Sequence, residues 1–91
     1  MNLPGMLRSI SEEAFAGNAN VDVVMLGEKM ETISGRAFAD MSALKQAHLP
    51  GSVTQIAQDA FDGSDAVVIV CPQGSQAQTY AEEMGIPYVH P

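Results

Sequence analysis

The stretch DAVVIVCPQGSQAQTYAEEMGIPYV, from Asp65 to Val89, decides the fold class that the sequence predicts. An apolar segment at 66–71 leads through a Gly-Ser loop into residues with helical spacing, and a second apolar segment follows at 86–89. A near-continuous apolar run is typical of a strand buried on both faces, and Ser75 with Gln78 has the spacing of a helix-capping box. The order strand, loop, helix, strand predicts a parallel sheet with helical connections.

The same reasoning predicts one more strand and three more helices upstream. VDVVMLG, residues 21–27, is short and apolar, as expected of a buried strand. Apolar residues recur at helical spacing in three segments: 3–17, 37–47 and 52–61. The polar segment 27–36 is expected to be a loop, and a short strand at METIS, 30–34, is the alternative. We find no internal repeat.

These elements predict one domain, residues 1–91, with a small Rossmann-like α/β fold. It is expected to be a three-layer domain with a short parallel sheet of about three strands and four helices. A sheet this narrow has both edges close to its centre, so we expect pairing with another copy of the chain or with a partner protein.

Charge and composition exclude several classes of function. The 91 residues hold 11 acidic and 4 basic side chains, a net charge of −7, which repels nucleic acids and anionic membranes. The longest apolar runs, VVML and AVVIVC, are far shorter than the ~20 residues of a membrane helix. One cysteine and an N-terminal segment with early acids favour a reducing, cytoplasmic location.

The predicted sheet places a candidate ligand site at two loops. In open parallel sheets, ligands bind beyond the carboxyl ends of the strands, near helix N-termini. The residues expected there are Gly27, Glu28, Lys29, Gln73, Gly74, Ser75 and Gln76. Glycine permits close approach to the backbone, and the hydroxyl and amides suit a small polar or anionic ligand. The alternative is that Ser75 only caps a helix.

Cys71, the single cysteine, also has two interpretations. A thiol between a strand and a helix N-terminus has the position of an activated nucleophile. A small apolar residue that ends a buried strand is the structural interpretation, which we prefer. His48 and His90 have no metal-ligand spacing to each other or to Cys71, so neither a metal site nor a cofactor is expected.

FDGSDAVVIVCPQGSQAQTYAEEMGIPYV resembles the C-terminal half of nucleoside 2-deoxyribosyltransferase-like proteins and of the related SLOG nucleotide-binding group. The matching pieces are Ser64-Asp65, 66–70, Gly74-Ser75 and Gly85-Ile86-Pro87. The glycosyl-transferring members carry a glutamate in the helix after the loop, whereas this helix begins SQAQTYA. The resemblance therefore implies binding of a nucleoside or nucleotide without catalysis.

A second resemblance is to the cysteine-phosphorylated B components of the bacterial sugar phosphotransferase system, through Cys71, Gly74 and Ser75. In that family the cysteine follows the first strand, whereas only 20 residues follow Cys71 here. The preferred hypothesis is a module that binds a nucleotide-like or anionic small molecule and lacks catalytic machinery. The alternatives are an enzyme that uses Cys71, and a ligand-free regulatory or interaction protein that acts through oligomerisation.

Overall fold

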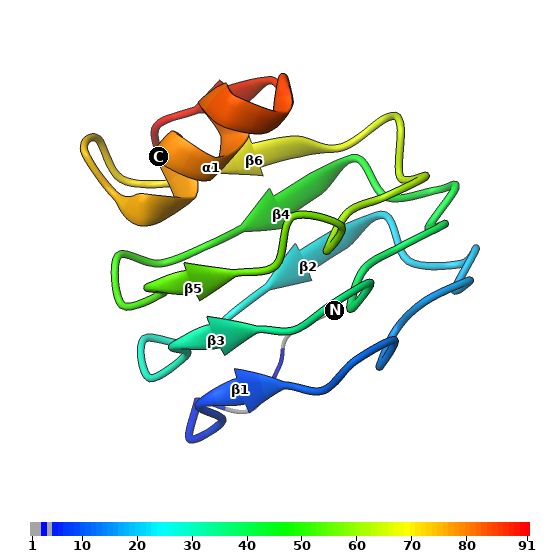
Figure 1. Ribbon diagram of the computed structural model, residues 1–91, viewed down its shortest axis with the longest axis horizontal. Helices are drawn as coiled ribbons and strands as arrows, with labels where there is room; N and C mark the ends of the chain where they lie inside the picture. The colour runs from blue at the N-terminus through cyan, green and yellow to red at the C-terminus, as the bar shows by residue number, and fades with distance from the viewer. Residues whose placement is uncertain (1–2, 4) are drawn as a thin grey trace.

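The structure is a computed structural model that describes residue 3 and residues 5–91. The chain winds upward in successive coils, and each coil places one short strand in each of two sheets (Figure 1). The strands are β1 (Ser9–Ile10), β2 (Val23–Met25), β3 (Thr32–Ile33), β4 (Gln46–His48), β5 (Gln55–Ile56), β6 (Val68–Val70) and β7 (Tyr88–Val89). One helix, α1 (Gln76–Met84), precedes the last strand.

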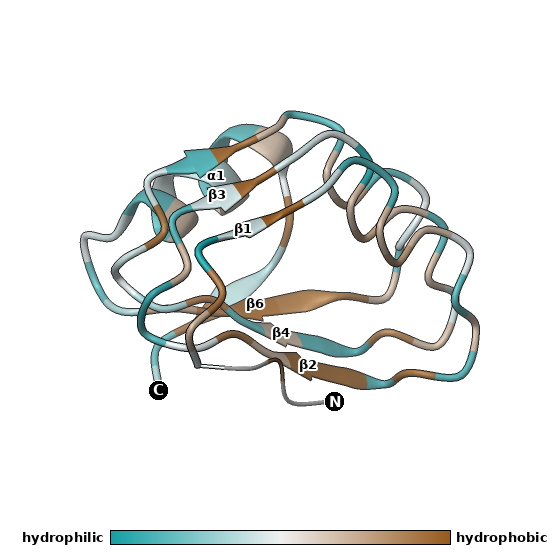
Figure 2. Cartoon of the chain, turned by 90° about the horizontal axis from the view of Figure 1, so that it is seen from below, coloured by the Kyte–Doolittle hydropathy of each residue, from teal (hydrophilic) through white to brown (hydrophobic). Residues whose placement is uncertain are grey.

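Both sheets are parallel. A three-stranded sheet has the order β1-β3-β5, and a four-stranded sheet has the order β2-β4-β6-β7. Figure 2 shows the two sheets as facing layers, joined on one side by tightly wound long turns and on the other by short turns. The long turns are residues 11–22, 34–45 and 57–67, and the short turns between coils are 26–31 and 49–54.

The strand register shows that the coils repeat. Ser9 pairs with Thr32, and the Arg8–Glu31 bond beside this pair also joins residues 23 apart. The repeated residues are Ile10, Ala14 and Phe15 in the first coil, Ile33, Ala37 and Phe38 in the second, and Ile56, Ala60 and Phe61 in the third. The expectation that the sequence holds no internal repeat is therefore wrong.

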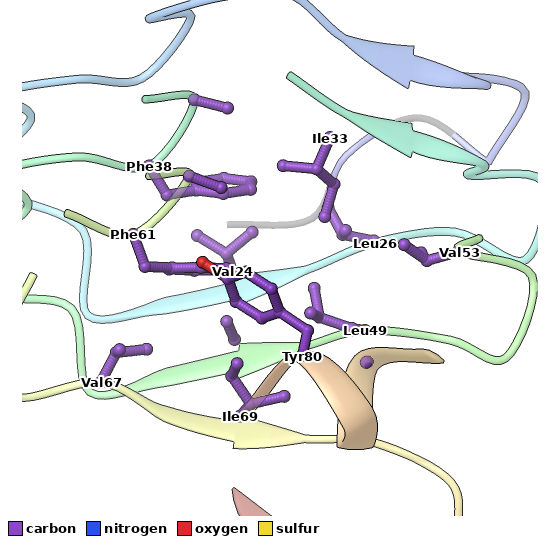
Figure 3. Packing of buried hydrophobic residues seen from close by; sticks show 14 of the residues in the cluster. Val24, Leu26, Ile33, Phe38, Leu49, Val53, Phe61, Val67, Ile69 and Tyr80 are labelled. Carbon is purple, nitrogen blue, oxygen red and sulfur yellow. The ribbon is translucent and has the colours of Figure 1, made fainter. Parts of the chain in front are cut away.

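A stack of aromatic rings runs through the coils. The ring centroids of Phe15 and Phe38 lie 5.6 Å apart, and those of Phe38 and Phe61 lie 5.2 Å apart, with nearly parallel planes. Tyr80 of α1 ends the stack at 6.2 Å from Phe61 (Figure 3). Because the rings come from equivalent positions of successive coils, each coil buries its aromatic residue against the next one. Val24 and Ile69, both fully buried, belong to the same core and come from the four-stranded sheet.

Three of the four predicted helices are absent from the described residues, and the Rossmann-like three-layer arrangement is wrong. Residues 34–45 do not form a right-handed helix, because Arg36 and Asp40 adopt left-handed backbone conformations, with φ values of 55° and 54°. Ser52 does not cap a helix, since its hydroxyl donates to the carbonyl oxygen of Met30 in the previous turn, at 2.6 Å. The METIS segment, expected as a loop, contains β3.

The C-terminal part of the prediction is confirmed. Residues 68–70 and 88–89 form parallel neighbours, and α1 lies between them in sequence. Ser75 is the N-cap of α1, and Gly85 ends the helix with a φ of 71°. The last strand, β7, lies at the edge of its sheet, as its flanking prolines predict. The helix packs on β5, β6 and β7, and so covers part of the C-terminal end of the coils.

Candidate interaction surface

The four-stranded sheet presents an apolar surface to solvent. Val24, Ala47 and Ile69 point into the core and are fully buried, so their neighbours along each strand point outward. We call this surface the outer sheet face; it comprises Val23, Met25, Gln46, His48, Val68, Val70 and Val89. Met25 is 44% exposed and Val89 50% exposed, although both are large apolar side chains. In Figure 2, β2 and β6 stand out as hydrophobic along this layer.

The outer surface of the three-stranded sheet is polar by comparison. Its strands direct Ser9, Thr32 and Gln55 outward, because their neighbours at Ile10 and Ile33 are buried. Arg8 and Glu31 form an exposed ion pair at 3.1 Å beside these strands. This surface is suited to water, whereas the outer sheet face is not.

A groove continues the outer sheet face toward the short turns. It has a volume of about 240 Å³, and its lining includes Met25, His48, Val70, Glu28, Pro50 and Pro72. The ring nitrogen Nε2 of His48 lies 3.1 Å from the side-chain oxygen of Gln46, so the two polar residues of the central strand bond to each other. The apolar surface therefore has a polar centre on β4.

The structure separates the two loops that were expected to form one ligand site. Gly27, Glu28 and Lys29 follow β2, whereas Gln73 to Gln76 follow β6, and β4 lies between these strands. Two strand spacings set the loops roughly 10 Å apart. Glu28 lines the groove beside the outer sheet face, whereas Gln76 lines a different hollow with Thr79 and Tyr80.

The polar groups of the second loop bond within the loop and to α1. The hydroxyl of Ser75 donates to the carbonyl oxygen of Pro72 at 2.7 Å and accepts from the backbone N–H of Gln78 at 3.2 Å. The side-chain oxygen of Gln78 in turn accepts from the backbone N–H of Gly74 at 2.9 Å. These bonds are those of a helix cap.

In the first loop, Gly27 allows the backbone of Gly5 to pass close by, because a Cβ at residue 27 would lie 2.7 Å from the Cα of Gly5.

Cys71 lies in the core at the end of β6 and is fully buried. Burial raises the pKa of the Cys71 thiol, a hydrogen bond with Ser75 lowers it, and the nearby charge of Glu82 raises it further. The net effect favours the thiol over the nucleophilic thiolate. Neither His48 nor His90 is bonded to it, since His90 contacts the side chain of Gln78. Among the described residues, no group of three or more His, Cys, Asp or Glu side chains could hold a metal ion.

An ion-pair network lies on the long turns, on the side of the molecule opposite the short turns. Arg36 bonds Asp40 at 2.8 Å and Asp62 at 3.0 Å, and its Nε lies 3.8 Å from Glu13. The network links all three coils, because each contributes at least one member. The three carboxylates are largely exposed and the Arg36 side chain is 36% exposed, so each pair contributes little to stability.

The outer sheet face was missed by sequence reasoning, although a signal for it was present. Val23 to Met25 and Val68 to Val70 are apolar at every position, which was interpreted as burial on both faces. The structure buries the inner face fully, whereas on the outer face Val23, Met25 and Val68 stay partly or largely exposed and only Val70 is buried. The side chains predicted as core on the other face are therefore the candidates for contact with a partner.

The coils, their register and their shared core define a repeat protein of the solenoid class. Residues 1–80 match the family described as BspA type leucine rich repeat region (6 copies), and the chain belongs to that family. The strand register gives a period of 22–23 residues, since Val23 pairs with Gln46 and Gln46 with Val68, and this lies within the range for leucine-rich repeats. Comparison with curated proteins and with solved structures found no match.

The family corrects three earlier expectations. The resemblance to nucleoside 2-deoxyribosyltransferase-like and SLOG proteins is wrong, because the matched family spans 80 residues and is a repeat family. The Rossmann-like fold and the nucleotide-binding function that followed from it are wrong for the same reason. The interaction protein, an alternative in the sequence interpretation, agrees better with the family. Among residues 3 and 5–91, the structure has no helix that is long and apolar enough to span a membrane.

Proposed function

We propose that this chain is a protein-interaction module and that it binds its partner through the outer sheet face. One observation carries the proposal: in this parallel sheet the strands β2 and β6 are wholly apolar, and the outer face leaves Met25 44% and Val89 50% exposed. Parallel sheets in proteins are almost always covered on both faces. Leucine-rich repeats use their extended surfaces for binding, which supports the same assignment.

The chemistry of the outer sheet face suits a protein partner. Met25 and Val89 supply exposed apolar area on both sides of β4, and methionine adapts to irregular surfaces. Gln46 and His48 lie between them as hydrogen-bonding groups that fix the orientation of the partner. An apolar patch with a few polar groups is the usual composition of an interface core.

A site-specific photo-crosslinking experiment tests this function. A benzoyl-phenylalanine placed at Met25 reports on the outer sheet face, and one at Gln55 reports on the polar surface of the other sheet. The tagged protein is irradiated in an extract of its source cells. We expect a discrete protein adduct from position 25 and none from position 55. Equal adducts from both positions, or none from position 25, would contradict the proposal.

A charge substitution provides the second arm. Val68→Asp places a carboxylate on the outer sheet face, where it faces solvent in the free protein and is desolvated in a complex. Thr32→Asp is the matched control on the other sheet, since its side chain is also half-buried and directed outward. Loss of the position-25 adduct in Val68→Asp, with retention in Thr32→Asp, is the expected result.

A further inference from the structure

On the third coil, α1 and β7 take the place of a fourth coil: β7 extends the four-stranded sheet, and Tyr80 of α1 contacts the third long turn. In the first two coils the backbone N–H of the stacked phenylalanine donates to the next coil, from Phe15 to Ala37 at 2.9 Å and from Phe38 to Ala60 at 2.8 Å. At the third coil the hydroxyl of Tyr80 donates to the carbonyl oxygen of Gln58 at 3.1 Å. The side chain also covers the ring of Phe61 (Figure 3).

Tyr80 leaves part of this end open. A hollow of about 270 Å³ lies between the third long turn and the end of α1. Phe61, Tyr80 and Met84 supply apolar walls, and the side chain of Met84 is 44% exposed. Gly63 and Asp65 line the side toward the long turn. The hollow occupies the place that the next coil would fill in a longer solenoid.

The charged groups around the hollow are all acidic. Asp62 and Asp65 line it, and no lysine or arginine does. Asp62 already bonds Arg36 at 3.0 Å, whereas the described residues give Asp65 no ion pair. The C-terminal end of α1 also lies here, and the last turn of this helix carries no basic residue to balance its negative dipole end.

We propose that this hollow binds a lysine or arginine side chain of a protein partner. The aliphatic part of that side chain packs mainly on Met84, beside the nearly buried rings of Phe61 and Tyr80, and its charged head reaches Asp65 and the carbonyl end of α1. The protein's net charge of −7 also attracts partners that carry lysine and arginine. The inference rests on the proposed function only in that the side chain belongs to a protein.

An NMR titration with a small probe tests the hollow without any partner. The ¹⁵N-labelled full chain is titrated with N-acetyl-lysine methylamide, and with N-acetyl-norleucine methylamide as a neutral control of similar shape. We expect saturable amide shifts at Gly63, Asp65 and Gly85 with the lysine probe, at a Kd of about 1 mM. The norleucine probe is expected to cause no saturable shift at these amides.

Two variants separate a specific site from general attraction between charges. Asp65→Asn is expected to weaken binding of the lysine probe about fivefold. Asp22→Asn makes the same change of charge at an exposed position in the first coil and is expected to leave the Kd unchanged. Absence of saturable shifts, equal shifts with both probes, or equal effects of the two variants would each overturn the proposal. Failure of the crosslinking at Met25 would leave this result unaffected, so the two proposals fail separately.

Discussion

Truncation of the central ring of the aromatic stack is expected to remove about half of the protein's stability. Phe38 is fully buried and has a stacked partner on each face, Phe15 at 5.6 Å and Phe61 at 5.2 Å. Replacement of a buried phenylalanine by alanine costs about 3–5 kcal/mol, and two stacked partners place Phe38→Ala near 5 kcal/mol. At ~0.1 kcal/mol per residue, a chain of this length has a free energy of unfolding of about 9 kcal/mol.

The control is the ring at the outer end of the same stack. Phe15 is half-buried and has one stacked partner, so Phe15→Ala is expected to cost about 2 kcal/mol. Urea unfolding followed by circular dichroism measures both variants. With an m-value of about 1.5 kcal/mol/M, the midpoint falls by about 3 M for Phe38→Ala and by about 1 M for Phe15→Ala. Equal shifts for the two variants would refute stacking of successive coils.

Three further predictions follow from the end of the third coil. Ser64→Ala is expected to cost about 3 kcal/mol in urea unfolding, because the buried hydroxyl bonds the Phe38 carbonyl at 2.5 Å and the Met41 N–H at 2.9 Å; a cost below 1 kcal/mol would contradict this role. Gly63→Ala is expected to destabilise more than Gly17→Ala: both glycines have positive φ, but only the new Cβ at Gly63 would overlap a side chain, that of Asp40. Burial raises the pKa of Tyr80 from 10.0 to about 12, so stability is expected to hold below pH 10 and to fall as the pH rises from about 10 to about 12. Tyr80→Phe is expected to weaken that fall, which unfolding curves between pH 8 and 12 measure.

The sequence predicts the C-terminal third of the fold and misses the rest for a physical reason. Around α1, local signals agree with the tertiary structure, since Ser75 caps the helix and Gly85 ends it. In the coils, apolar residues recur at intervals of three and four because strands alternate and turns wind tightly, not because a helix forms. Ala37, Met41 and Leu44 are all fully buried, yet they lie on a long turn. Packing between coils determines this conformation, and a window of one coil does not contain that information.

The repeat itself was predictable from the sequence. The pair Ala-Phe recurs at 14–15, 37–38 and 60–61, each time four residues after an isoleucine, at a constant interval of 23 residues. The second halves of the coils hide the pattern, since VVML, QAHL and VIVC share little besides their inward positions. A search for fixed periods before secondary structure is assigned finds such a repeat.

The candidate surfaces were also only partly predictable, because some of their features are local in sequence and others depend on packing between coils. The apolar composition of β2 and β6 was visible in the sequence, but which face is left uncovered depends on how the two sheets stack. The hollow beside Tyr80 is built from residues about 20 positions apart that only the coil geometry brings together. The role of Ser75 as a helix cap, by contrast, was predicted from local spacing.

Nuclear Overhauser contacts between aromatic rings test the stacked-coil fold most directly. In uniformly labelled protein, we predict ring-to-ring contacts between Phe15 and Phe38 and between Phe38 and Phe61, because their centroids lie 5.6 Å and 5.2 Å apart. No contact is predicted between Phe15 and Phe61, which lie on opposite sides of Phe38. Absence of both neighbouring contacts, or helical amide contacts throughout residues 37–47, would contradict the repeat fold and the interaction surfaces built on it.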